Sequence, residues 1–259
     1  EWGRGCQSCG AHAYPAIHPC AIVLVTRPGE VLLTRKPAWA PNRYSLVAGF
    51  QEFGESLEEA ALREIAEETG LMVPIGEWVL NHACNQLSEW QQAGKAPIGM
   101  AVNLSPVQFQ NQEMSAVFKR IIENSGIDPR LLTLEVTESI LLEDLESKIE
   151  SMNRLKDLGL KLAIDDFGTG YSSLSYLKKL PLDELKIDHS FFIDLFADTK
   201  SRALLTSLLY LSRNLNLLTV AEGVETKEQL NFLKNEGCDQ YKGFLFSPPV
   251  PFQKLFEML

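Results

Sequence analysis

The sequence predicts an α/β protein: an incomplete (β/α) barrel preceded by a smaller fragment of β-strands and one helix. After residue 71, six strand-like runs alternate with helical patterns, which is typical of a parallel sheet with right-handed crossovers. Polar residues occur at or near the carboxyl ends of these runs, where barrel enzymes hold their functional groups. Before residue 71, short strands lead instead into a single acidic helix.

The bulk composition limits the classes of protein to which the chain can belong. Its 259 residues suffice for one barrel domain or two small domains, and a hydrophobic fraction of 45% can build a core. A formal net charge of −10 argues against binding a nucleic acid polymer, although metal ions can hold a nucleotide at an acidic site. No apolar run reaches about 18 residues, so no membrane span is expected.

The five cysteines are scattered along the chain rather than spaced as a disulfide framework. Such sparse and odd usage is typical of a reducing compartment, so we expect a cytoplasmic location. The first residue is Glu1 rather than methionine, and we therefore expect that the start of the chain is cut.

Three short strands are expected near the N-terminus. Residues 20–25 and 31–35 are predicted to pair as a hairpin around the turn Pro28-Gly29. Residues 44–49 are expected to form the third strand.

A helix is expected to follow, from a capping-box start at Ser56 to a C-terminal glycine at Gly70. Three of its carboxylates, Glu64, Glu67 and Glu68, are spaced i, i+3 and i+4 and therefore share one face. Such a cluster is either a solvated charged face or a site for magnesium or manganese.

The spacing from Gly49 to Leu71 resembles the Nudix box. Upstream segments, among them Tyr14-Pro15 and His18-Pro19-Cys20, resemble the NADH pyrophosphatase branch of that superfamily. The resemblance implies a pyrophosphatase in which a metal ion polarises the substrate and activates water. The metal ligands or base that it implies are Glu64, Glu67 and Glu68, with Glu55 assisting.

This N-terminal part departs from a complete Nudix hydrolase in two ways. Cys6-Gln-Ser-Cys9 resembles half of the family's zinc ribbon, but a four-ligand zinc site needs a second pair, so zinc is not expected. The strands and second helix that should follow the box to close the Nudix fold are missing. We therefore assign residues 1–71 to a Nudix-like fragment, with its box at residues 49–71.

The remainder of the chain carries the alternating pattern. An apolar helical stripe from Ile75 to Leu87, with Pro74 just ahead of its first turn, opens this part. The expected strands are residues 99–103, 131–136, 160–165, 184–187, 217–221 and 241–246, and the expected helices include residues 114–123, 145–158, 201–211 and 227–235.

Six polar residues lie at or near the ends of these expected strands. One acidic residue after one strand would be an ordinary helix N-cap, but several strands that end in such residues favour a catalytic site. Carboxylates and an amide oxygen suit two magnesium or manganese ions, and a lysine can stabilise the charge of a phosphoryl group. The six residues are Asn103, Glu135, Asp165, Asp166, Lys186 and Glu222.

The motifs around these residues resemble, in the family's order, those of EAL-domain cyclic di-GMP phosphodiesterases. The resemblance covers residues 66–259 and implies a TIM-like barrel. The motifs are Asn103-Leu-Ser105, Glu135-Val-Thr-Glu-Ser139, Asp165-Asp-Phe-Gly-Thr-Gly170, Lys186-Ile-Asp188 and Glu222-Gly-Val-Glu225.

The EAL resemblance also implies the role of each residue. Metal-activated water would attack one phosphodiester of cyclic di-GMP, or of another nucleotide, and the linear dinucleotide pGpG would be the product. A homodimer is among the assemblies that the resemblance implies. The implied metal ligands are Asn103, Glu135 and Asp165; Asp166 would lie beside the second metal, Lys186 and Glu222 would complete the catalytic site, and Glu225 would support the loop over it.

The barrel part also departs from its family. The Glu-Ala-Leu segment, which would supply a metal-binding glutamate and a phosphate-contacting arginine, is missing together with the first strands. About six of the eight barrel units are therefore expected. Lys242 stands where the family usually has glutamine. We consequently expect a phosphodiesterase with weak or absent turnover.

Three alternatives stay open. The chain is a cyclic-di-GMP-binding or remnant module, a Nudix-type pyrophosphatase, or a recombinant chimera joined at residues 66–71, where both families share Ala-Glu-Glu-Thr-Gly-Leu. A further hypothesis uses residues 45–49 as the missing second strand, which would bring Glu52 or Glu55 near the metal site.

Overall fold

The chain forms two compact units, residues 1–73 and residues 74–259, which we describe separately. This computed structural model describes part of the chain. That part comprises residues 4–5, 12–13, 20–23, 26–27, 30–31, 47–50, 63, 66, 69–111, 113–138, 140, 144–168, 177–193 and 195–258.

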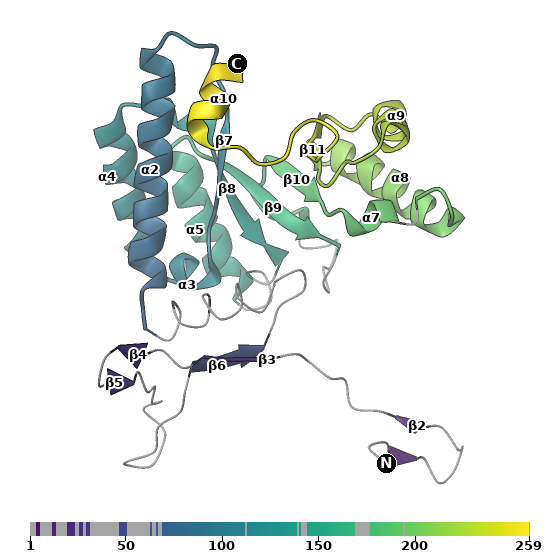
Figure 1. The fold of residues 1–259 in the computed structure, drawn as a ribbon, viewed down its shortest axis with the longest axis horizontal. Helices are drawn as coiled ribbons and strands as arrows, with labels where there is room; N and C mark the ends of the chain where they lie inside the picture. The colour runs from purple at the N-terminus through teal and green to yellow at the C-terminus, as the bar shows by residue number, and fades with distance from the viewer. Residues whose placement is uncertain are drawn as a thin grey trace. The chain divides into compact units, whose positions relative to one another are not determined.

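Among its described residues, the N-terminal unit contains three antiparallel strand pairs (Figure 1). β4 and β5 pair on either side of residues 28–29, which agrees with the predicted turn. β3 pairs with β6, and residues 32–35 lie outside the described residues, so the predicted pairing of residues 20–25 with 31–35 stays a prediction. The strands are β1 (Arg4–Gly5), β2 (His12–Ala13), β3 (Cys20–Val23), β4 (Thr26–Arg27), β5 (Glu30–Val31) and β6 (Val47–Phe50). The helix expected over residues 56–70 lies largely outside the described residues.

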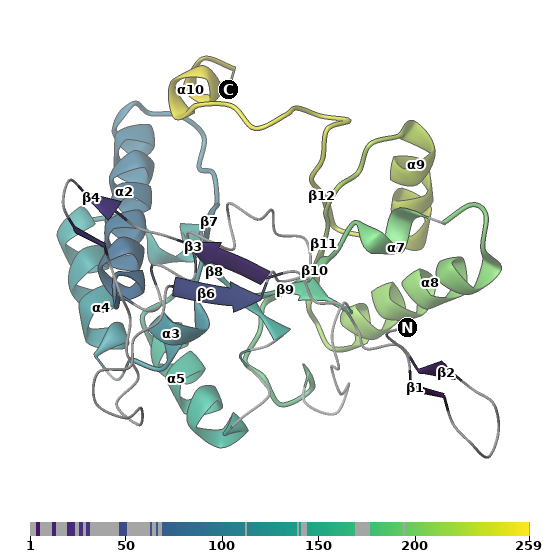
Figure 2. The same cartoon turned by 60° about the horizontal axis from the view of Figure 1, so that its bottom comes forward.

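The C-terminal unit is built on one six-stranded parallel sheet, as the alternating pattern predicts (Figure 2). The strand order follows the chain without interruption, so each strand lies beside the next one in sequence. This is the topology of part of a (β/α) barrel. The strands are β7 (Met100–Asn103), β8 (Leu132–Thr137), β9 (Lys161–Phe167), β10 (Glu184–Ile187), β11 (Leu218–Ala221) and β12 (Gln240–Tyr241).

Helices connect these strands and cover the sheet (Figure 1). Local sequence explains several of their ends: the Asp198 carboxylate caps α8, a Thr226–Gln229 capping box opens α9, and Gly237 ends α9 in the left-handed conformation. The helices are α2 (Met72–Gln92), α3 (Pro106–Phe109), α4 (Met114–Ser125), η1 (Pro129–Leu131), α5 (Leu145–Asp157), α7 (Ser190–Ile193), α8 (Thr199–Asn214), α9 (Lys227–Glu236) and α10 (Phe252–Met258). None of the described helices is long and apolar enough to cross a membrane.

Two sequence-based boundaries are wrong. The run predicted as a strand over residues 241–246 leaves the sheet after Tyr241, because the chain turns at Gly243 and its backbone bonds to the loop after β11. Gly243 permits this close approach: a Cβ atom there would lie 2.2 Å from the Val224 carbonyl oxygen. Helix α2 begins at Met72, two residues before this unit, so Pro74 lies inside its first turn rather than ahead of it.

The C-terminal helix α10 packs against the end of α2 around the buried side chain of Trp90, which is 1% exposed. The Trp90 indole N–H donates to the Ala96 carbonyl at 2.7 Å. Its ring meets Phe256 edge-on with centroids 5.4 Å apart, and the Lys95 ammonium lies 4.5 Å from the centre of the Phe256 ring. Helix α2 and the C-terminal helix are therefore joined through the contacts of Trp90 with Phe252 and Phe256.

Replacing Trp90 with alanine should lower the free energy of unfolding by about 3–5 kcal/mol, because the change leaves a cavity and frees the α10 contact. Trp78, which is 65% exposed on the same helix, is the matched control and should cost less than about 1 kcal/mol. Urea unfolding followed by circular dichroism measures both variants. Equal losses in the two variants would contradict the proposed anchoring of α10.

Candidate functional site

Lys186 lies at the centre of the site. It is on β10, between β9 and β11, and its side chain is only 5% exposed. Its ammonium contacts three carboxylates from three other strand ends: Glu135 at 2.7 Å, Asp165 at 2.8 Å and Glu222 at 3.0 Å. Parallel strands place their carboxyl ends at one edge of the sheet, and this is why residues far apart in sequence meet here.

The charges in this cluster depend on one another. Burial alone would lower the pKa of Lys186, but its hydrogen bonds with Asp165 and Glu135 outweigh that effect and raise the pKa above its ordinary value. Burial raises the pKa of Glu135, and the neighbouring lysine opposes this rise. Lys186 is therefore a fixed positive charge that stabilises an otherwise repulsive set of anions.

An irregularity in β9 brings two consecutive aspartates into the site. Leu185 and Ile187 of β10 are two residues apart, but their partners Ile164 and Phe167 on β9 are three residues apart. The extra residue is a β-bulge, and Asp166 has a φ of +51°. In a regular strand neighbouring side chains point to opposite faces, so the bulge accounts for a site that uses both Asp165 and Asp166.

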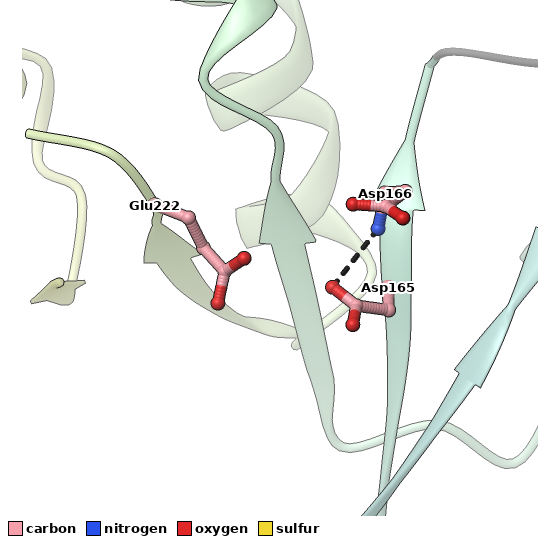
Figure 3. Close-up of side chains that lie close together, drawn as sticks. All are labelled: Asp165, Asp166 and Glu222. Atoms are coloured by element: carbon pink, nitrogen blue, oxygen red, sulfur yellow. Dashed lines mark hydrogen bonds between the residues drawn. The ribbon is translucent and has the colours of Figure 1, made fainter. Parts of the chain in front are cut away.

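Asp165, Asp166 and Glu222 form a group with oxygen ligands suited to a divalent cation (Figure 3). One carboxylate oxygen from each of the three lies within 4.8 Å of the others. Burial, together with the negative charges of Asp165 and Asp188, raises the pKa of Asp166. Hard oxygen ligands with mutual repulsion fit a hard divalent cation, since a bound cation would relieve that repulsion.

The remaining residues named from the sequence lie around this group. Asn103 is exposed and pairs in register with Glu135 across β7 and β8, so both are at the same level of the sheet. Glu225 is exposed after β11, and its backbone N–H donates to the Gln229 side chain at 2.9 Å. The four Nudix-box residues Glu55, Glu64, Glu67 and Glu68 lie outside the described residues.

Glu138 is a functional candidate to which the sequence analysis gave no role. Its carboxylate accepts a hydrogen bond of 2.7 Å from the Gly168 N–H, and its other oxygen is buried without a hydrogen-bond partner among the described residues. Gly168 has a φ of +97°, and a Cβ atom there would lie 2.3 Å from the Phe191 ring. Glu138 thus ties the end of β8 to Gly168, the residue that follows β9. The sequence signal that could have identified Glu138 is its position three residues after Glu135.

Replacing Glu138 with alanine should speed hydrogen exchange at the Gly168 amide, because that N–H loses its acceptor. The free energy of unfolding should fall by about 1–3 kcal/mol. Glu138→Gln is the control, since its amide oxygen can still accept the bond. Amide exchange followed by NMR distinguishes the variants, and equal protection of Gly168 in both would show that the contact does not hold this segment.

Comparison with protein families gives a match to the EAL domain over residues 46–249. The match begins before residue 66, where the sequence motifs place the start of the barrel part, and it includes β6. Among curated proteins, the bifunctional diguanylate cyclase/cyclic di-GMP phosphodiesterase MucR of Pseudomonas aeruginosa is 44% identical over 191 residues. That alignment covers 74% of this chain but only 28% of MucR, and the chain spans about a quarter of the length of the curated relatives it matches.

Solved structures give the same family. The structure described as the PaMucR phosphodiesterase in complex with c-di-GMP has a TM-score of 0.72 and 36% identity, covering 92% of each chain. The EAL domain of Mycobacterium smegmatis DcpA has a TM-score of 0.68 and 37% identity, covering 71% of this chain and 83% of that one. With the parallel half-barrel and the family match over residues 46–249, these similarities show that the chain belongs to the EAL domain family.

Proposed function

We propose that this domain is a metal-dependent phosphodiesterase that opens cyclic di-GMP to linear pGpG, with weak turnover. The observation that carries the proposal is the contact of one buried lysine with three carboxylates at the strand ends, beside a group suited to a divalent cation. The MucR structure in complex with c-di-GMP supports cyclic di-GMP as the ligand.

The proposed roles follow from position and charge. Asn103, Glu135, Asp165 and Asp166 would hold magnesium or manganese, together with Glu222. When bound, such ions activate water and neutralise charge on the phosphoryl oxygens. Lys186 orients Glu135, Asp165 and Glu222, and its permanent positive charge favours the extra negative charge of the transition state. Glu225 and Glu138 support the loops that border the site.

Weak turnover is proposed because the Glu-Ala-Leu segment is absent from the sequence, and with it a metal-binding glutamate and an arginine. A missing ligand disturbs both water activation and charge stabilisation. The same departure makes a cyclic-di-GMP-binding module without turnover the second candidate. The Nudix box of residues 49–71 motivates a third outcome, pyrophosphate hydrolysis.

One experiment separates these functions. The purified chain is incubated with manganese or magnesium and given cyclic di-GMP or NADH in separate reactions, with EDTA-treated protein as the control. Metal-dependent formation of pGpG supports the proposal, and binding of cyclic di-GMP without product supports the binding module. Nicotinamide mononucleotide would indicate the Nudix reaction. A folded chain that neither binds nor hydrolyses cyclic di-GMP would overturn the proposal.

A further inference from the structure

A second lysine contacts the same carboxylate oxygen that Lys186 contacts. The Lys242 ammonium lies 3.0 Å from Oε1 of Glu222, and the Lys186 ammonium lies 3.0 Å from that same atom. The two lysines differ in exposure: the Lys186 side chain is 5% exposed, whereas that of Lys242 is 68% exposed. Glu222 therefore has one buried, permanent cationic partner and one partner that can move into water.

The backbone around Lys242 fixes it beside Glu222. The Lys242 N–H donates to the Ala221 carbonyl at 2.8 Å, and the Val224 N–H donates to the Lys242 carbonyl at 3.0 Å. Lys242 is therefore hydrogen-bonded through its backbone to Ala221 and Val224, which flank Glu222 and Gly223. The fold therefore places the long side chain of residue 242 within reach of Glu222.

We propose that Lys242 is a built-in counter-cation that competes with a divalent metal ion for Glu222 and thereby weakens metal binding. The inference rests on the proposed function only in treating Asp165, Asp166 and Glu222 as the metal-binding group. A carboxylate oxygen that accepts bonds from two ammonium groups is a poorer metal ligand, since a metal ion must displace one of them. The exposed Lys242 is the group that leaves, and its charge also reduces the negative potential that attracts a cation.

The test measures manganese affinity by isothermal titration calorimetry, without substrate. Lys242→Gln should tighten the manganese Kd by about five-fold at low salt. A change of this size is expected on losing an ion pair whose lysine is exposed. Lys242→Arg keeps the charge and should remain close to the wild-type affinity. Lys254→Gln removes an exposed lysine from α10 and should leave the affinity unchanged. The gain in Lys242→Gln should shrink as salt rises, because salt screens the exposed ammonium.

The outcomes also separate this inference from the proposed function. Equal or weaker manganese binding by Lys242→Gln, in protein shown by circular dichroism to be folded, overturns the inference. Unchanged manganese affinity with weaker cyclic di-GMP binding would assign Lys242 to the nucleotide instead. Tighter manganese binding without pGpG formation would leave the inference standing and overturn the proposed turnover. Absence of manganese binding in every variant would overturn the metal site, and the inference with it.

Discussion

Replacing Lys186 with methionine should abolish most of the proposed phosphodiesterase activity and strongly destabilise the domain. The change keeps an unbranched side chain, one heavy atom shorter, but removes the positive charge that Glu135, Asp165 and Glu222 share. Leaving buried carboxylates without their partner should lower the free energy of unfolding by about 3–5 kcal/mol. Loss of a preorganised charge at the reacting group should lower turnover by about 100- to 1000-fold.

The pH dependence of the Lys186→Met variant gives an independent check. Burial already raises the pKa of Glu135, and removal of the lysine that opposes this rise should place its folded-state pKa further above the unfolded value, so protonation relieves the repulsion at low pH. Stability should therefore be lost as the pH rises, and the deficit relative to wild type should be larger at pH 8 than at pH 5. Urea unfolding at both pH values measures it.

Lys161→Met is the matched control for this experiment. Lys161 is at the opposite end of the neighbouring strand, is 44% exposed and lies 3.7 Å from Glu184. An exposed ion pair of this kind contributes only about 0–1 kcal/mol. A Lys186→Met variant as stable and active as Lys161→Met would show that the central lysine is not required.

Replacing Asp165 with asparagine should lower manganese affinity by at least about 100-fold, because partners of metal ligands already contribute 10- to 100-fold. Turnover should fall with it. Asparagine keeps the size of the side chain and can still accept a hydrogen bond from Lys186, so the fold should be retained. Calorimetry and product formation measure the two effects.

Asp157→Asn is the control for Asp165→Asn, because it makes the same chemical change at an exposed position on α5. Its manganese affinity and turnover should match those of wild type. If Asp165→Asn also binds manganese with wild-type affinity, Asp165 is not a metal ligand, and the proposed division of roles between Asp165 and Lys186 is wrong.

Local sequence predicted the sheet and its helices well where the apolar periodicity of a run and its length indicate the same element. The strand predicted over residues 184–187 is β10 itself, and the other strands of the sheet, apart from β12, differ from prediction by two residues or fewer at each end. The failure at β12 involves a long-range contact, because the chain turns away there and bonds to the loop after β11. This turn has no local signature.

Apolar periodicity and strand–helix alternation are local properties, so the parallel α/β architecture and the polar residues at the strand ends could be predicted from the sequence. The interactions among those residues depend on the tertiary structure. The fold puts Lys186 among three carboxylates, places a bulge at Asp165 and Asp166, joins Glu138 to Gly168 and brings Lys242 to Glu222. Each of these depends on the register and spacing of strands distant in sequence, which local patterns do not specify.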